Sequence, residues 1–241
     1  MSLQPSKARG GKSVYGASVG ILMLEAQFPR IPGDVGNAAT FPFPVHYKVV
    51  RGASPDRVVR QQSEGLLAPF IEAARELEAE GVDGITTTCG FLCLFQAELA
   101  AAVRVPVATS SLMQVAFVNR LLPAGKRAGI LTISQSSLTP AHLSTSNVPP
   151  GTPVGTTEGG REFTQAVLGN KTELDIAAAR DDNVEAARKL QAAHPEVGAI
   201  VLECTNMSPY AADIRAATGL PVFSILTLIS WFQAGLSPPE F

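Results

Sequence analysis

The sequence predicts an α/β protein of two lobes, each built on a parallel sheet with helices packed on its faces. Short apolar runs alternate with amphipathic helical stretches from Val19 to the end of the chain. The alternation occurs as two similar series, one starting at Val19 and one at Arg127. The 241 residues, 46% of them hydrophobic, are enough for one large domain or two small lobes with cores of their own.

The first series begins with the buried apolar run VGILML. We expect its strands over 19–24, 45–50, 82–88 and 105–111, and its helices over 63–81, 91–103 and a further stretch that ends at Pro123. Pro69 must lie in the early turns of the first of these helices, because a later proline would kink it. Gly81 is expected to end the same helix.

The second series repeats the plan. We expect strands over 127–134, 152–157, 197–203 and 220–226, and helices that begin at Arg161, Asp182 and Ser208. Asp182 is followed three residues later by Glu185, which is the spacing of a capping box. Ser208 followed by Pro209 is a typical N-cap and first-turn pair.

Strand–helix alternation of this kind favours two Rossmann-like lobes related by pseudo-twofold symmetry, with a cleft between them. We interpret residues 1–14 as a flexible N-terminal tail. The first lobe is expected to span 15–118 together with 220–241, completed by the strand at Val222, and the second lobe 119–219.

Composition and charge exclude several functions. A net charge of -2 offers no attraction to nucleic acid or to an anionic membrane. No apolar run reaches the roughly 18–20 residues of a membrane span, and the basic N-terminus has no signal-type apolar stretch behind it, so we expect a cytoplasmic protein. Gly11-Lys12-Ser13 lacks the glycine and the preceding strand of a phosphate-binding loop.

Two of the three cysteines follow predicted strands. Cys89 and Cys204 each come after an apolar strand and shortly before a helix, about one lobe's length apart. Ligands of parallel α/β sheets bind at this edge, and helix N-termini there lower the pKa of a thiol. We therefore expect two thiolate-prone sulfurs on opposite walls of one cleft. Cys93, one helical turn beyond Cys89, is expected in the core, and without nearby histidines the cysteines predict no metal site.

The segments TTTCGFL and LECTNM resemble the two signature cysteine segments of the aspartate/glutamate/hydantoin racemase superfamily. The resemblance implies a cofactor-independent isomerase, a racemase or epimerase in which Cys89 and Cys204 flank the reacting carbon. One thiolate would remove a proton next to a carboxylate or carbonyl, and the other thiol would return one. Gly90 and Phe91 stand where amino-acid racemases have Asn-Thr, which favours a less polar substrate.

Three alternatives remain open at this stage. Relatives with the same fold isomerise maleate or decarboxylate arylmalonates with a single essential cysteine. Asn206, in place of the histidine typical of glutamate racemases, leaves those activities open. A two-lobed chain can also bind a small acid without any chemistry. The expected partner is a small carboxylate or carbonyl compound, and a homo-oligomer is compatible with the sequence.

Further polar residues are candidates for substrate binding. Backbone N–H groups and hydroxyls at the strand ends would stabilise developing negative charge, and we assign this to Thr88, Gly90, Thr205 and Asn206. The long loop over 26–44 is typical of a lid or binding loop and contains Asn37, which otherwise serves only a turn. Arg51 could hold a carboxylate or be simply solvated, and Ser134 could bind substrate or merely cap a helix.

Overall fold

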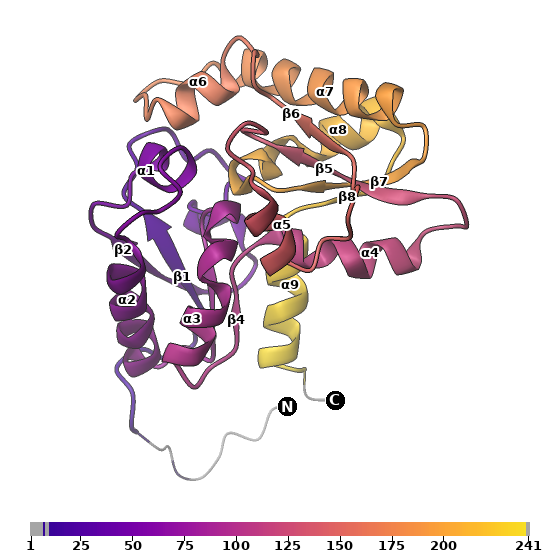
Figure 1. The fold of residues 1–241 in the computed structure, drawn as a ribbon. Helices are drawn as coiled ribbons and strands as arrows, with labels where there is room; N and C mark the ends of the chain where they lie inside the picture. The colour runs from indigo at the N-terminus through magenta and orange to yellow at the C-terminus, as the bar shows by residue number, and fades with distance from the viewer. Residues whose placement is uncertain (1–6, 8–9, 240–241) are drawn as a thin grey trace.

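The computed structural model, described for residues 7 and 10–239, contains two four-stranded sheets in which every pair of neighbouring strands is parallel. The strand orders are β2-β1-β3-β4 and β6-β5-β7-β8, so the second sheet repeats the topology of the first. Figure 1 shows the two sheets side by side, each with helices packed against it. The predicted fold class of two related α/β lobes is confirmed.

The first sheet and its helices come from the first half of the chain. Its elements in order are β1 (Val19–Leu24), β2 (Val45–Val50), α1 (Pro55–Val59), α2 (Leu67–Glu80), β3 (Gly84–Thr87), η2 (Gly90–Phe95), α3 (Gln96–Ala102) and β4 (Val107–Ala108). A short 3-10 helix, η1 (Ala38–Thr40), lies in the loop before β2. Gly81 ends α2 with φ of 111°, a conformation that favours glycine.

The second sheet follows with the same plan. Its elements are η3 (Ser111–Gln114), α4 (Val115–Leu121), β5 (Arg127–Thr132), α5 (Pro140–Thr145), β6 (Val154–Thr156), α6 (Phe163–Leu168), α7 (Ile176–Ala193), β7 (Val197–Leu202), η4 (Thr205–Tyr210), α8 (Ala211–Thr218), β8 (Val222–Phe223) and α9 (Ile225–Leu236). Both chain segments that leave a third strand, β3 and β7, continue as 3-10 helices.

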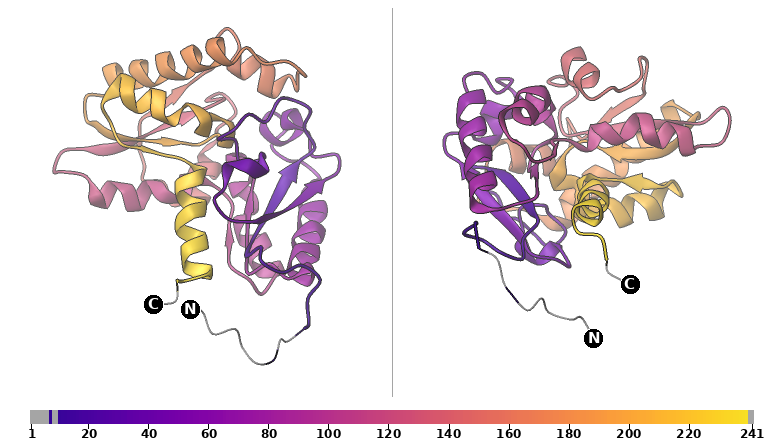
Figure 2. Two further views of the ribbon diagram at one scale, coloured as in Figure 1. Left: turned by 180° about the vertical axis from the view of Figure 1, so that it is seen from behind. Right: turned by 90° about the horizontal axis from the view of Figure 1, so that it is seen from below.

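The strand at Val222 corrects the expected lobe boundary. β8 pairs with β7 in the second sheet and does not complete the first lobe. The following helix does return to the first lobe, because Ile225 and Ile229 of α9 pack with Val19 and Ile21 of β1. Seen from behind, α9 runs down beside the first sheet (Figure 2). The chain therefore crosses between the lobes a second time at Ser224.

Two predicted helix starts are wrong. Asp182 lies in the middle of α7, which begins after Asp175, and its carboxylate accepts hydrogen bonds from the backbone N–H groups of Arg161, Glu162 and Phe163. Asp182 therefore accepts hydrogen bonds from the free backbone N–H groups at the start of α6, from its place in the neighbouring helix α7, and is not the N-cap of α7. Ser208 lies inside η4, which Cys204 caps.

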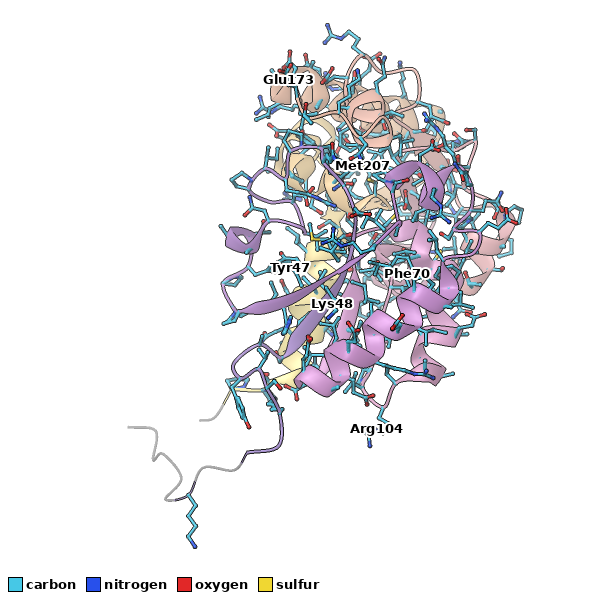
Figure 3. All side chains as sticks on the ribbon, turned by 90° about the vertical axis from the view of Figure 1, so that its left-hand side faces the viewer. Tyr47, Lys48, Phe70, Arg104, Glu173 and Met207 are labelled. Carbon is cyan, nitrogen blue, oxygen red and sulfur yellow. The ribbon has the colours of Figure 1, made fainter. Side chains whose placement is uncertain are left out.

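The loop between β1 and β2 is folded back on the first lobe. The Tyr47 hydroxyl of β2 donates a hydrogen bond to the Val35 carbonyl, 2.7 Å away. Lys48, on the same strand, pairs with Glu76 and Glu80 of α2 (Figure 3). These contacts hold the long loop and α2 against the edge strand.

The predicted tail is anchored over part of its length. Residues 1–6 and 8–9 lie outside the described residues. Lys12 donates a hydrogen bond to the Gly81 carbonyl, and the Val14 N–H donates to Glu80 O, so this part is fastened to the end of α2. Within residues 7 and 10–239, no helix is long and apolar enough to cross a membrane.

Candidate active site

Cys89 and Cys204 occupy equivalent positions of the two lobes. Cys89 follows β3 and caps η2, and Cys204 follows β7 and caps η4. In both cases the chain turns from an extended cysteine into a 3-10 helix, so the sulfur lies beside the first N–H groups of that helix. The backbone N–H group of Phe91 lowers the pKa of the Cys89 thiol, and that of Asn206 lowers the pKa of the Cys204 thiol.

Both thiols line one cavity between the lobes. Its volume is about 10 Å³, room for about one water molecule. The apolar part of the wall comes from both lobes: Leu24, Phe28, Pro55, Val59 and Phe91 from the first, and Ile133, Val167 and Leu168 from the second. The polar groups are Thr88, Cys89, Glu203, Cys204 and Asn206. In this conformation the cavity therefore has no room for a substrate of several heavy atoms, and α1 and α6 contribute wall residues from opposite lobes.

The thiols are not thiolate-prone in this closed state. Burial raises the pKa of Cys89 well above its usual range, and the nearby carboxylate of Glu203 raises it further. Burial, Glu203 and Cys89 likewise raise the pKa of Cys204. The N–H groups of the two 3-10 helices lower the pKa of both thiols, but by less than burial raises it. The expectation that helix ends lower these pKa values is therefore wrong for the closed cavity, because desolvation dominates.

Glu203 is a third ionisable group in the cavity. It is fully buried, and the Thr132 hydroxyl donates a hydrogen bond to Oε2 over 2.7 Å. Its Oε1 has no hydrogen-bond partner among the described residues. Burial raises the pKa of Glu203 to about 7, against a smaller lowering by the Thr132 hydroxyl. Sequence reasoning missed this residue, although it directly precedes Cys204.

Gly90 is required by the position of Glu203. A Cβ added to Gly90 would lie 2.3 Å from both the carbonyl oxygen and Oε1 of Glu203. Gly90→Ala is therefore expected to lower the free energy of unfolding by about 1–3 kcal/mol, as overpacking does. The matched control is Gly235→Ala in α9, where no heavy atom lies within 4 Å and the change should be neutral or stabilising by up to ~1 kcal/mol. Urea unfolding of both variants checks this, and equal effects would contradict it.

The ionisation of Glu203 predicts a pH-dependent stability effect. Its pKa is higher in the folded chain than the usual 4.5, so folding favours the protonated form, and this advantage is lost as the pH rises from 4.5 through about 7. Glu203→Gln is expected to raise the free energy of unfolding at pH 8 by on the order of 3 kcal/mol, with little change near pH 4.5. Urea unfolding at both pH values measures this, and the same difference at each would contradict it.

A hydrogen-bond chain joins the cavity to the long loop. The Asn206 side chain donates to Asp34 Oδ2 over 2.6 Å, and the Cys204 thiol lies 3.6 Å from Asn206 Oδ1. Asp34 in turn pairs with Arg30 through Oδ1, at 3.0 Å. The loop over 26–44 thus contributes buried charge next to the thiols, which fits its predicted role as a binding loop.

Arg30 is the second residue that sequence reasoning missed. Its guanidinium stacks on the ring of Phe28, 4.4 Å from the ring centre, and Phe28 lines the cavity. The Nε and Nη2 atoms are buried and have no hydrogen-bond partner among the described residues. These two nitrogens form one edge of the guanidinium, the edge that binds a carboxylate bidentately. No local sequence pattern marks Arg30, because its stacking on Phe28 and its missing hydrogen-bond partners are properties of the folded chain.

The structure brings some of the predicted site residues together and not others. Thr88, Phe91 and Asn206 line the cavity with the two thiols. Thr205 lies behind it, where its hydroxyl donates across the lobes to the Thr88 carbonyl at 2.7 Å. Cys93 is 1% exposed and packs in a separate apolar cluster, as expected.

Three predicted binding residues lie away from the cavity. Asn37 donates to the Arg30 carbonyl and accepts from Ala39 N, so it serves the turn of η1. Arg51 is exposed and pairs with Glu25 at 2.7 Å. Ser134 bonds to Glu158 at 2.8 Å. Their contacts are those of structural or solvated residues, and none of the three lines the cavity.

The residues that the structure describes form a second hollow, away from the thiols. A larger groove of about 510 Å³ runs along α7 and β6, lined by charged residues such as Asp182 and Lys189, and is separate from the thiols. Among the residues that the structure describes, no group of three or more His, Cys, Asp or Glu side chains could hold a metal ion.

The fold matches that of known enzymes. A mutant of arylmalonate decarboxylase with bound sulfate superposes with a TM-score of 0.62 at 16% identity, covering 90% of this chain and 92% of that one. The glutamate racemase RacE1 of Bacillus anthracis gives 0.55 at 16% identity, covering 92% and 84%. The chain therefore has the fold of the aspartate/glutamate/hydantoin racemase superfamily, as the cysteine segments predicted.

The relatives found by sequence are named after a different activity from those of the structural neighbours. A dimethylsulfoniopropionate lyase of Durusdinium sp. clade D is 28% identical, over 99% of this chain and 82% of the relative. Dimethylsulfoniopropionate lyase 3 of Emiliania huxleyi (strain CCMP1516) is 30% identical, over 91% of this chain and 60% of its own length. No family model matches the chain.

Proposed function

We propose that this chain is a lyase that releases dimethyl sulfide from dimethylsulfoniopropionate or a close β-sulfonium acid, using a cavity thiol as the base. The observation that carries the proposal is the pair of thiols on one closed cavity, in a chain whose relatives are named dimethylsulfoniopropionate lyases. The predicted isomerase activity shares the first chemical step with this reaction, the removal of a proton next to a carboxylate.

The reaction is an elimination. A thiolate takes a proton from the carbon next to the carboxylate, and the electrons of that C–H bond form the new double bond. The bond between the β-carbon and sulfur breaks, and its electrons leave with the sulfur as neutral dimethyl sulfide. Acrylate remains, and the thiol later returns its proton to solvent.

The residues around the cavity suit this step. The backbone N–H groups of Phe91 and Asn206 lower the pKa of the adjacent thiols and would stabilise whichever becomes a thiolate. The free guanidinium edge of Arg30 would hold the substrate carboxylate and stabilise the charge that develops on it. The apolar wall keeps water away from the reacting carbon once the lobes have closed.

Racemisation or epimerisation is the second candidate, because two equivalent thiols share the cavity. A substrate without a leaving group would be reprotonated by the opposite thiol, which inverts the carbon. A sulfonium leaves as a neutral molecule and needs no general acid, so the lyase requires only one of the two thiols as base. The two candidates therefore differ in how symmetrically the thiols contribute.

The test is direct. The purified chain is incubated with dimethylsulfoniopropionate, and dimethyl sulfide is measured in the headspace and acrylate in solution by NMR. The lyase proposal expects the two products in equal amounts. Amino acids and hydantoins are incubated in heavy water in parallel. Exchange of their α-hydrogen without any dimethyl sulfide would favour the racemase, and tight binding without turnover would contradict both.

A further inference from the structure

Glu203 has no part in the elimination as described, yet it is a fully buried carboxylate on the wall of the cavity. Its Oε2 is satisfied by Thr132, whereas Oε1 has no partner among the described residues. A buried charged oxygen without a partner costs free energy unless something else supplies the missing interaction. The groups around Oε1 determine what kind of ligand could supply that interaction.

The surroundings of Glu203 lack a cation. The titratable groups that face it are the thiols of Cys89, Cys93 and Cys204, and its charge raises the pKa of all three. No lysine, arginine or histidine is among the residues that line the cavity. Arg30 does not itself line the cavity and is already paired with Asp34. His142 contacts Phe91 edge to face, and burial lowers the pKa of His142 to about 4, which keeps it neutral.

The other walls near Glu203 suit an alkylated cation better than a hydrated one. Phe91 and Phe28 line the same cavity, and the remaining wall is largely aliphatic. Aromatic faces attract onium groups, which have no N–H or O–H bonds to satisfy. A carboxylate beside aromatic rings in an apolar cavity is complementary to a sulfonium or quaternary ammonium group.

We propose that Glu203 is the counter-ion for an onium group of the substrate, so that the cavity selects small zwitterions with an alkylated cation at one end and a carboxylate at the other. This inference rests on the proposed function, which supplies the carboxylate and the reacting carbon. Glu203 and Arg30 then divide the two charges of the substrate between them.

The pairing also accounts for how a thiolate could form in so unfavourable a cavity. Glu203 and a thiolate are two negative charges in an apolar space, and the charge of Glu203 raises the pKa of both cavity thiols. A bound cation offsets one of these charges and lowers the pKa of the thiol. When the cation leaves as neutral sulfide, the offset is lost, and the thiol keeps the proton it took from the substrate until the next cation binds.

Binding of an onium analogue tests the site independently of turnover. The probes are 3-(trimethylammonio)propionate and its isostere 4,4-dimethylpentanoate, in which an uncharged carbon replaces the cationic nitrogen and the carboxylate is kept. Calorimetry at pH 8 should show the cationic probe binding to the wild-type chain roughly tenfold or more tightly than the isostere, because a cation and a carboxylate attract each other more strongly in a desolvated cavity than in water. NMR of the recovered probe checks that it has not reacted.

The pH dependence has a defined sign. The cation binds ionised Glu203, so below its pKa of about 7 a proton must first be displaced. Affinity for the cationic probe should be constant above pH 7 and fall by up to about tenfold per pH unit between 7 and 5.5. The isostere should show no such fall. His46 and His194 pair with the carboxylates of Glu80 and Glu196, and neither lines the cavity.

Variants complete the experiment. Glu203→Gln should abolish both the preference for the cation and its pH dependence. Glu158→Gln, a matched change in the same lobe away from the cavity, should keep both. If Glu203→Gln does not fold, the pH series on the wild-type chain is decisive by itself. Equal affinity of the wild-type chain for the two probes, or a cation preference that survives in Glu203→Gln, would overturn the inference.

Failure of this inference is distinguishable from failure of the proposed function. If dimethyl sulfide is released but the cation preference does not depend on Glu203, the lyase stands and the counter-ion role falls. If the cationic probe binds through Glu203 but no dimethyl sulfide appears, the cation site stands and the lyase falls.

Discussion

Replacing Cys89 or Cys204 by alanine is expected to cause the largest losses of activity that this chain can show. The variant that removes the base should lose ~10²–10⁴-fold in turnover of dimethylsulfoniopropionate, the usual contribution of a general base. The other variant should lose less, because a sulfonium leaving group needs no acid. Steady-state assays of dimethyl sulfide release measure both effects.

Cys93→Ala is the matched control for the thiol variants. Cys93 is buried in a separate cluster, where its thiol donates to the His142 carbonyl at 3.5 Å. Its removal should leave the activity per folded molecule close to that of the wild-type chain. Equal, near-complete losses in the Cys89 and Cys204 variants, with exchange of α-hydrogen, would favour the racemase. Full activity in both would end any thiol mechanism.

Arg30→Met is expected to produce the second largest effect. Removing the guanidinium leaves the substrate carboxylate without its bidentate partner, an interaction of about 1.5–3 kcal/mol for hydrogen bonds to charged groups. The KM for dimethylsulfoniopropionate should rise by roughly 10- to 150-fold. Arg51→Met is the matched control, because Arg51 is exposed and pairs with Glu25. Its KM should not change.

Arg30 also holds Asp34, so its removal could act through the loop instead of through the substrate. Arg30→Lys separates the two roles, because lysine keeps the charge and the pairing but loses the planar edge. If Arg30→Lys restores the pairing with Asp34 but the KM stays raised, the role of Arg30 is to bind the substrate carboxylate. A KM unchanged in Arg30→Met, or raised equally in Arg51→Met, would contradict the assignment.

The sequence predicted the fold and the thiol positions because both depend on local patterns. Strand–helix alternation and the apolar runs before Cys89 and Cys204 are readable along the chain, and parallel sheets place strand ends at one edge. The partner of the strand at Val222 was not predictable in this way. A strand of two residues carries no lobe preference, and it pairs with β7 of the second sheet although the helix that follows it, α9, packs against the first.

The remaining errors have tertiary causes. Asp182 satisfies the local rule for an N-cap but caps backbone N–H groups about twenty residues away. The thiol pKa values depend on closure of the cavity, which no motif encodes. Glu203 and Arg30 became candidates only through their missing hydrogen-bond partners, a property of the folded chain. Sequence motifs thus located the two thiols of the cavity, but not the charges arranged around them.

The central claim, that the reaction is an elimination that begins with removal of the proton next to the carboxylate, is tested most directly with dimethylsulfoniopropionate that carries two deuterium atoms on that carbon. Mass spectrometry of the acrylate formed by the wild-type chain measures how much deuterium remains. Elimination through this carbon predicts acrylate that has lost one of the two deuterium atoms, with dimethyl sulfide that carries none. Acrylate that keeps both atoms, or dimethyl sulfide released without acrylate, would contradict the account.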